Sequence, residues 1–455
     1  MPRAQSPRGS QRERHAAVTR FLIKPRWLVP VEPAGRVLEG HAVAVAAGRI
    51  EAILAPGARW PDYPVVELPE HVLIPGLVNA HTHAAMTLMR GLSDDLPLMR
   101  WLEDHIWPAE RQHVSAAMVR DGTLLACAEM LRGGITCFNE MYFFPDAALE
   151  AALAAGMRAA LGIIVIDFPT AYASDPADYL RKGLELRDRQ GDQPLASFCL
   201  APHAPYTVSD ATFRQVATLA AELDLPVHLH LHETEDEIAR SVAEHGVRPL
   251  ERMRRLGVLG PGLIAVHAVH LEKYEIDLLG SHACSVAHCP SSNLKLASGF
   301  APVEALRKAG VNVCLGTDGA ASNNRLDVLQ EMRTAALLAK AVARDAEALP
   351  EHAALRAATL AGAQALGLGD VIGSIQPGKA ADLTAVALRG PELAPCYDPV
   401  SHLVYAAGRE NVTHVWVNGE LRVRDRELLG EAFSALDTRW RIWQNSLKSH
   451  ADADP

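Results

Sequence analysis

The chain has 455 residues, of which 49% are hydrophobic and 22% are charged, and its formal net charge is -10 at pH 7. This length suggests one large domain with a smaller one, or a barrel with additions, and the composition is typical of a soluble globular enzyme. The negative charge argues against a nucleic-acid partner, because phosphate binding needs a basic surface.

The sequence shows no sign of a membrane or secretory protein. No apolar run reaches the length that spans a bilayer. The seven cysteines are scattered without a Cys-x-x-Cys pair, which is typical of reduced thiols in the cytoplasm. The first twenty residues are rich in arginine but lack an apolar signal-peptide core. We therefore expect a cytoplasmic protein with no membrane partner.

Short strand-like runs occur near both ends of the chain. Residues 42–45 and 50–53 flank a Gly-Arg turn, which predicts a hairpin. Residues 415–417 and 421–423 flank Asn418-Gly419, the strongest short hairpin turn. Both ends are therefore predicted to build one small β-sandwich around an inserted domain. The predicted plan is a disordered basic arm (1–20), the N-terminal half of the sandwich (21–74), a barrel (75–372), the C-terminal half of the sandwich (373–430), and a C-terminal helix and tail (431–455).

The middle of the chain alternates apolar runs with helical segments such as 115–131, 210–222 and 326–343. Eight strand–helix units in about 300 residues predict an α/β fold, a (β/α)₈ TIM-type barrel. A doubly wound open sheet is the alternative, but no glycine fingerprint follows the first strand. The predicted strands are one ending at Val78 and the runs 136–139, 158–166, 196–201, 227–231, 264–267, 285–288 and 313–316.

A His-x-His motif stands at the start of this predicted barrel. It follows the apolar run Val72–Ile74, which is read as a buried strand. Side chains two residues apart on a strand point the same way, so His81 and His83 should face one side together. Two imidazoles at a strand end are half of a zinc or iron site. An isolated His-x-His is commonly two unrelated polar residues, but ligand-type residues also follow the later strands.

In such a barrel, the chemistry is located at the carboxyl ends of the strands. Titratable residues stand at nearly every one of these ends. Buried polar groups cost free energy unless they are paired, so core filling explains them poorly and convergence on one metal explains them well. The residues are His81, His83, His203, the run His228–Glu233, His267, His288 and Asp318.

Two of these places hold more detailed information. His228, His230 and His232 alternate and are predicted to face the barrel interior. Each step of two residues along a strand covers about 6.6 Å, so they cannot all bind at one height, and spacing does not choose between His230 and His232. Glu233 lies just beyond the strand, where a carboxylate could move protons. Asp318 ends the last predicted strand and suits a ligand or a base.

Together these residues resemble the amidohydrolase superfamily and, within it, the 5′-methylthioadenosine/S-adenosylhomocysteine deaminase family. The resemblance covers essentially the whole chain after residue 20, including both β-rich ends. The matching stretches are PGLVNAHTHAAMTLMRGLSDDLPLMRWLEDHIWPAE (75–110), APHAPYTVS (201–209), HLHET (230–234), VHAVHL (266–271), HCPSSNLKLASG (288–299) and LGTDGAASNN (315–324).

The resemblance implies one divalent metal per subunit, zinc first, with iron or manganese as alternatives. The family's catalytic glutamate lies three residues after its ligand histidine, which selects His230 and makes Glu233 catalytic. No lysine stands at a strand end to form a carbamylated bridge, so a single metal is expected. The implied metal ligands are His81, His83, His230 and Asp318.

The remaining roles also come from the resemblance. Glu110 matches the residue that binds ribose hydroxyls, and His203 matches a substrate-binding histidine. His267 matches the histidine beside the attacking water. The implied catalytic residues are Glu233, His267 and Asp318, and the implied substrate-binding residues are Glu110, His203, Glu233 and Asp318.

The implied reaction is hydrolytic deamination of the adenine ring of 5′-methylthioadenosine, to 5′-methylthioinosine and ammonia. Adenosine is the second expected substrate. Family members that accept S-adenosylhomocysteine place arginines after the third strand, near Ile163 and Tyr179 here, and neither position is basic. The apolar segment 164–169 suits a methylthio group and not an unpaired carboxylate. S-adenosylhomocysteine should thus be poor, unless Arg181 or Lys182 supplies the charge.

Two other functions are alternatives to this one. The same metal site could deaminate or hydrolyse another ring, such as guanine, a pterin or a triazine. Glu110 would then have no ribose to hold. The second alternative is not an enzyme: the chain could be a non-catalytic scaffold with the amidohydrolase fold. The full set of ligand-type residues argues against this function. The expected partner is a small-molecule nucleoside, and the family suggests a homo-oligomer, either a dimer or a tetramer.

Overall fold

The computed structural model describes residues 20–451, and its central feature is an eight-stranded parallel sheet. The strands follow one another in chain order from β6 to β13, each paired with its neighbour. Each strand run predicted for this region is present, and the ends differ by a few residues at most. The strands are β6 (Leu77–Thr82), β7 (Ile135–Glu140), β8 (Arg158–Val165), β9 (Ala196–Pro202), β10 (Val227–Leu231), β11 (Leu263–His267), β12 (Ser285–His288) and β13 (Asn312–Leu315).

The last strand of this sheet meets the first. Just past β13, the backbone N–H groups of Thr317 and Asp318 donate to the carbonyl of His81 on β6, at 3.1 and 3.0 Å. The Asn79 side chain adds a second link, because it donates to the Thr317 hydroxyl at 2.7 Å and accepts from the Thr317 N–H at 2.9 Å. The sheet is therefore a barrel, which confirms the predicted fold and excludes the open doubly wound sheet.

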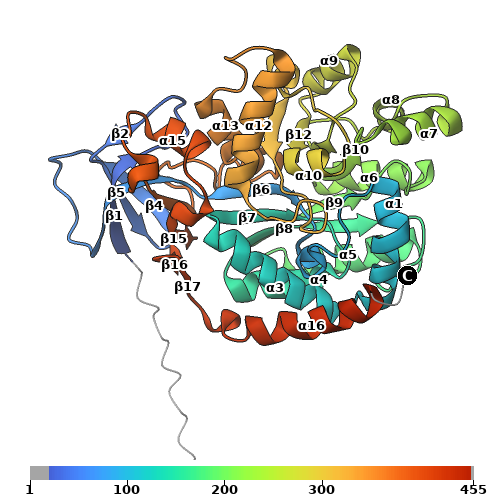
Figure 1. Ribbon diagram of the computed structural model, residues 1–455, viewed down its shortest axis with the longest axis horizontal. Helices are drawn as coiled ribbons and strands as arrows, with labels where there is room; N and C mark the ends of the chain where they lie inside the picture. The colour runs from blue at the N-terminus through green and yellow to red at the C-terminus, as the bar shows by residue number, and fades with distance from the viewer. Residues whose placement is uncertain (1–19, 452–455) are drawn as a thin grey trace, which may run out of the picture.

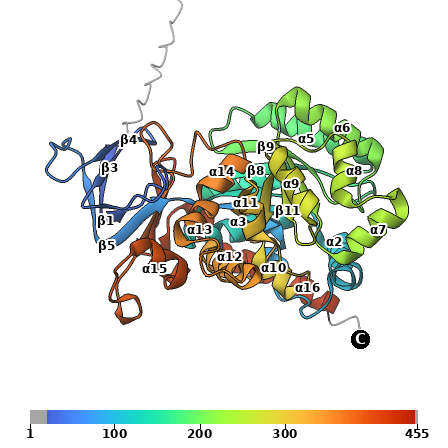
Figure 2. The ribbon, with the colours of Figure 1, turned by 90° about the horizontal axis from the view of Figure 1, so that it is seen from above.

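Helices cover the outside of the barrel (Figures 1 and 2). The three predicted ones are α3 (Ala116–Arg132), α6 (Asp210–Leu223) and α12 (Val328–Ala343), each begun by a Ser or Asp side chain that accepts a backbone N–H. The others are η1 (Ala84–Met89), α1 (Leu98–Trp101), η2 (Leu102–Ile106), α2 (Trp107–His113), α4 (Pro145–Ala155), α5 (Pro176–Gln190), α7 (Glu235–His245), α8 (Pro249–Arg255), α9 (Lys273–Ser281), α10 (Pro290–Lys295), α11 (Val303–Lys308), α13 (Glu351–Ala357), α14 (Leu360–Ala365), α15 (Pro399–Tyr405) and α16 (Leu436–Ala451), with short turns η3 (Pro391–Leu393), η4 (Arg409–Asn411) and η5 (Glu431–Phe433).

The two ends of the chain form a second, mixed sheet beside the barrel (Figure 2). Both predicted hairpins are present, and Asn418 and Gly419 have the positive φ values, 50° and 74°, that a tight hairpin turn favours. The expected small β-sandwich is thus one continuous nine-stranded sheet. Its strands are β1 (Arg20–Leu28), β2 (Leu38–Glu39), β3 (Ala42–Ala46), β4 (Arg49–Leu54), β5 (Val65–Pro75), β14 (Leu383–Ala387), β15 (Val412–Val417), β16 (Glu420–Arg424) and β17 (Glu427–Leu428).

Strand β5 separates the apolar run before the His-x-His motif from the barrel. Val72–Ile74 lies in β5, between β1 and β14 in the mixed sheet, and the first barrel strand is β6. Only Gly76 separates β5 from β6. A Cβ atom at Gly76 would lie 2.1 Å from the Thr136 hydroxyl oxygen, so the passage between the two sheets has room for glycine alone.

The outer segments of the chain are placed as follows. The predicted arm at residues 1–20 lies outside the described residues, apart from Arg20, which begins β1. Helix α16 runs along α3 (Figure 1), where Arg439 and Trp443 donate to the Asp121 carboxylate at 2.8 and 3.0 Å. Among residues 20–451, no helix is both long and apolar enough to cross a membrane.

A buried ion pair joins the barrel to the mixed sheet. Arg158, the first residue of β8, donates from Nε and Nη2 to the two Asp382 oxygens, at 3.1 and 3.2 Å. The two side chains are only 4% and 1% exposed. Asp382 also accepts the backbone N–H of Asn418 at 2.8 Å. Because solvent hydrates neither charge, each buried charge is stabilised mainly by its opposite partner.

Replacing Asp382 with Asn should leave the Arg158 guanidinium buried without its counter-charge. We expect the free energy of unfolding, measured by urea denaturation, to fall by about 3–5 kcal/mol. The matched control is Glu67→Gln, which removes the exposed Lys24–Glu67 ion pair and should change stability by less than about 0.5 kcal/mol. Equal effects of the two substitutions on stability would contradict the conclusion that the Arg158–Asp382 ion pair stabilises the fold.

Candidate metal centre

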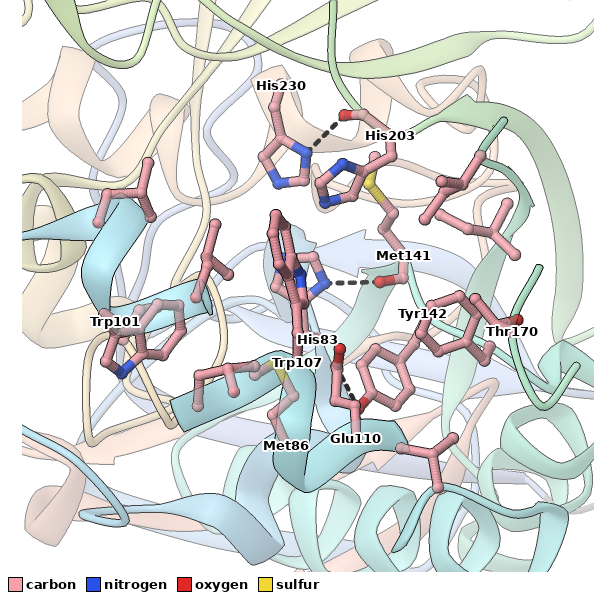
Figure 3. A pocket seen from close by; sticks show the side chains of 18 of the residues that line it. His83, Met86, Trp101, Trp107, Glu110, Met141, Tyr142, Thr170, His203 and His230 are labelled. Atoms are coloured by element: carbon pink, nitrogen blue, oxygen red, sulfur yellow. Dashed lines mark hydrogen bonds between the residues drawn. The ribbon is translucent and has the colours of Figure 1, made fainter. Parts of the chain in front are cut away.

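A cavity of about 570 Å³ opens at the carboxyl ends of the barrel strands. Helices α1, η2 and α2 cover one side of it, and the strand ends form the other. Figure 3 shows that His83, His203 and His230 come from the strand ends, whereas Trp101, Trp107 and Glu110 come from the covering helices. The sequence-predicted residues that line the cavity are His83, Glu110, His203, His230, Glu233, His267 and Asp318.

Three histidines and one aspartate meet at the floor of this cavity. His81 Nε2 and His83 Nε2 lie 3.2 and 3.3 Å from Asp318 Oδ1. The His230 ring centroid lies 4.9 Å from that of His81 and 5.4 Å from that of His83. A second set of ligand atoms within 4.8 Å of one another comprises His81, His230 and His267. The residues implied as metal ligands are thus neighbours in space, although up to 237 positions separate them in the chain.

Each of the three imidazoles has one ring nitrogen occupied by the protein. His81 Nδ1 lies 2.9 Å from His228 Nε2, while His83 Nδ1 and His230 Nδ1 donate to the carbonyls of Met141 and His203, at 2.5 and 2.7 Å. This pattern leaves Nε2 of each ring to face the shared point. Fixing one nitrogen with a hydrogen bond is how proteins orient histidine ligands.

The charges at this point fit a divalent cation. Burial lowers the pKa of His81 to about 4 and the pKa of His230 well below its usual value, so both are neutral, as ligands must be. Burial also opposes charge on His83, but contact with Asp318 raises its pKa to about 9. Asp318 therefore requires a positive charge beside it. A metal ion held by three imidazoles and a carboxylate meets this requirement.

Two serines hold the Asp318 carboxylate. Its Oδ2 accepts from the hydroxyls of Ser292 and Ser322, at 2.6 and 2.7 Å. Its Oδ1 accepts from the backbone N–H of Gly319 at 2.8 Å and faces the two histidines. The two oxygens therefore have separate environments. Asp318 has a φ of 58°, so the chain turns sharply after β13 and directs the side chain to the cavity floor.

The prediction that His232 faces the barrel interior is wrong. Strand β10 ends at Leu231, and His232 has a φ of 57°, which breaks the alternation of side chains. Its Nδ1 donates to the carbonyl of His270 at 3.0 Å, and its Nε2 accepts from the N–H of Leu250 at 2.9 Å. Because both nitrogens are occupied away from the metal centre, His230 is the only one of the pair placed to bind there.

Glu233 and His267 lie side by side above the cavity floor. His267 Nε2 is 3.6 Å from Glu233 Oε2, and His267 Nδ1 donates to Asn293 Oδ1 at 2.8 Å. The Ser298 hydroxyl lies 3.5 Å from Glu233 Oε1. Burial raises the pKa of Glu233, although His267 opposes this change. A raised pKa makes a carboxyl group better suited to donate a proton near neutral pH than an exposed one.

Glu110 lies on α2 and lines the same cavity (Figure 3). Its Oε1 accepts from the Tyr142 hydroxyl at 2.7 Å. Burial raises the pKa of Glu110 to about 7, and the hydrogen bond from Tyr142 opposes this shift. His203 follows β9, and its Nδ1 lies 3.0 Å from the Thr207 hydroxyl. Its other ring nitrogen is then left for a bound molecule.

Sequence reasoning missed several residues that hold the site together. Ser292, Asn293 and Ser298 follow β12, and Ser322 follows β13. All four stand inside the motifs that carry the family resemblance. Their only signal was polarity soon after a strand, which many loop residues share. Tyr142, the partner of Glu110, gave no signal.

A model of the amidohydrolase family matches residues 72–422. The chain therefore belongs to the amidohydrolase family. Curated relatives in it are the 5-methylthioadenosine/S-adenosylhomocysteine deaminases of Saccharophagus degradans, 47% identical over 422 residues (92% of this chain, 94% of the relative), and Teredinibacter turnerae, 48% identical over 430 residues (94% and 97%). Within the amidohydrolases the chain thus belongs to the 5-methylthioadenosine/S-adenosylhomocysteine deaminase family, which confirms the resemblance predicted from the motifs.

A solved structure supports the same placement. The zinc-bound adenosine deaminase of Xanthomonas campestris matches with a TM-score of 0.93 and 52% identity, and the match covers 94% of this chain and 98% of that one.

His230 on β10 and His232 just beyond its end provide a direct test of the metal centre. We expect His230→Ala to lower zinc affinity by more than about 100-fold, because groups that merely orient a ligand already change affinity by about 10–100-fold. His232→Ala should bind as much zinc as the unaltered protein. Atomic absorption after dialysis against a graded zinc buffer measures both, and circular dichroism checks folding. Zinc loss in His232→Ala alone would reverse the assignment.

Proposed function

We propose that this chain is a zinc-dependent aminohydrolase that deaminates the adenine ring of 5′-methylthioadenosine, giving 5′-methylthioinosine and ammonia. Adenosine is the second substrate, and S-adenosylhomocysteine is a poor one. One observation carries the proposal: the His₃Asp cluster adjoins His267 and Glu233, and Glu110 lines the same cavity. The names of the relatives support the same reaction class.

His81, His83, His230 and Asp318 would hold the metal. When bound, a zinc ion supplies Lewis acidity and lowers the pKa of water to about 7. Iron and manganese are the alternatives, because this donor set tolerates several divalent ions.

The side chains around the cluster have separate duties in the proposed reaction. Water attacks C6 of the adenine ring, Asp318 accepts a proton from it, and His267 orients it. Glu233 donates a proton to N1 as negative charge develops there. The proton held by Asp318 then passes, with the help of Glu233, to the exocyclic nitrogen, which leaves as ammonia. The new C6 hydroxyl returns a proton to Glu233 as the carbonyl of the inosine ring forms. The raised pKa of Glu233 supports its role as the acid.

The cavity walls support the preference for 5′-methylthioadenosine. Ile164, Ile166, Phe168 and Pro169 all line the cavity, so the wall at the third strand is apolar. Among the described residues, Arg111 is the only lysine or arginine in the lining. A methylthio group suits this wall, whereas the amino-acid tail of S-adenosylhomocysteine would leave polar groups poorly paired.

Neither cation considered from the sequence reaches this wall. Arg181 and Lys182 contact Asp178 at 2.6 and 3.0 Å and do not line the cavity. Ile163 packs against α5 near Gly183, and it is absent from the lining together with the buried Tyr179. The cytoplasmic location and the homo-oligomeric state stay predictions of the sequence.

An ultraviolet assay of the three nucleosides tests the proposed substrate order. We expect kcat/KM to fall from 5′-methylthioadenosine to adenosine and then to S-adenosylhomocysteine, and chelation to abolish all three activities until zinc is restored. If S-adenosylhomocysteine proved the best substrate, the apolar wall would not set specificity. If none of the three nucleosides reacted while guanine was deaminated, the proposal that adenine is the substrate ring would be wrong.

Glu110 should contribute only when ribose is present. We expect Glu110→Gln to lower kcat/KM for 5′-methylthioadenosine by about 100-fold, since a charged partner of two hydroxyls contributes about 1.5–3 kcal/mol, and to leave adenine turnover nearly unchanged. The carboxylate form of Glu110 is lost as the pH falls below about 7. The KM for the nucleoside should therefore rise on acidification in the unaltered enzyme and stay flat in the variant. If the KM of Glu110→Gln still changed with pH, the pH dependence would have to come from another group.

A further inference from the structure

The chain changes direction sharply where it leaves β10. Leu231 is the last strand residue, and helix α7 begins only four residues later, at Glu235. Between them, His232 has a φ of 57°, a backbone conformation that L side chains rarely adopt. This turn sends the His232 ring toward the carbonyl of His270, and it places Glu233 within 3.6 Å of His267.

A single buried carboxylate holds both peptide groups of this turn. Glu237, in the first turn of α7, accepts the backbone N–H of His232 on Oε1 at 2.9 Å and that of Glu233 on Oε2 at 2.8 Å. Its own N–H donates to the hydroxyl of Thr234, the N-cap residue, at 3.2 Å. The Glu237 side chain therefore reaches beyond the N-cap, which is the usual target of a glutamate at this position.

The two N–H groups belong to the peptide planes on either side of His232. Fixing both planes fixes the backbone torsions of His232, and these decide where the next side chain points. We propose that Glu237 is a positioning residue that aims Glu233 at the substrate ring. This inference rests on the proposed role of Glu233 as proton donor, and no side chain other than Glu237 contacts both N–H groups among the described residues.

Accepting both N–H groups at once requires a carboxylate at position 237. Burial raises the pKa of Glu237 to about 8, and the N–H groups of His232 and Glu233 oppose this rise by bonding to the carboxylate. In its ionised form the side chain offers two acceptor oxygens, one for each N–H. Glutamine of the same size offers one acceptor and an NH₂ group, which would face an N–H donor. The nearly isosteric change Glu237→Gln should therefore release one peptide plane without emptying the space, because Glu237 is only 5% exposed and tightly enclosed.

The first measurement compares kcat, KM and zinc content. We expect Glu237→Gln to lower kcat for 5′-methylthioadenosine by about 100-fold, because a shift of about 1 Å in a reacting group has a cost of this size. KM and the zinc bound per chain should stay within about twofold. A fall in zinc content to match the fall in kcat would overturn the proposal, since the residue would then act on the metal centre.

A double-mutant cycle separates positioning from general damage. If Glu237 acts through Glu233, then adding Glu237→Gln to Glu233→Gln should lower kcat by less than about twofold further. A merely structural residue would impose the same 100-fold loss in both backgrounds, and this result would overturn the inference. If Glu233→Gln alone retained full activity, the proposed function would fail instead, so the two failures are distinguishable.

A matched control is available on α11. Glu304 is also a buried carboxylate that accepts a loop N–H, from Leu349 at 3.1 Å, but it does not line the cavity. We expect Glu304→Gln to lower the unfolding temperature and leave kcat unchanged. Should Glu237→Gln not accumulate as soluble protein, Glu237→Asp serves in its place. Its side chain is one methylene shorter, so its carboxylate cannot reach both N–H groups. We expect kcat to fall again, and an unchanged kcat in this variant would overturn the inference.

Discussion

The structure depends on bringing three imidazoles and one carboxylate together in a largely buried place at the floor of a cavity. Such groups are costly to bury unless every polar atom finds a partner. The protein meets this constraint by occupying the outward atom of each group: His228 contacts His81, backbone carbonyls hold His83 and His230, and two hydroxyls hold Asp318. The inward atoms are thus left for a cation. The closing contact of the barrel, between His81 and the segment after β13, passes through the same place, so closure and site assembly are one event.

The barrel could be predicted from the sequence because its strands are buried on both faces and read as continuous apolar runs. Their order along the chain then determines the parallel topology. Apolar character alone does not mark the junction of the two sheets, because β5 and β6 are both apolar and a single glycine separates them. Hydrophobicity shows that a run is buried. It does not show which of two adjoining cores buries it.

The sequence predicted those site residues that lie on strands, where side chains alternate between the two faces. It did not predict the positions of residues beyond the strand ends. His232, His267 and Asp318 have positive φ values of 57°, 72° and 58°, and all three lie at or just beyond the end of a strand. Each turns the chain off the regular course of its strand. The alternation of side chains along a strand therefore placed His232 wrongly in the barrel interior. The family motif was needed to select His230 as the metal ligand. The serines that support Asp318 come from loops, where no period exists. Backbone strain concentrates where the chemistry is expected, as is common for functional sites.

The interleaving of the two chain ends has a consequence for biosynthesis. Strand β5 pairs with β14, and the Arg158 guanidinium has no carboxylate partner until Asp382 arrives. A nascent polypeptide still tethered to the ribosome before residue 382 can contain all eight barrel strands, yet β5 presents an open edge and a cation stays buried beneath it. Final consolidation of the barrel therefore waits until translation has passed β14, which ends at Ala387.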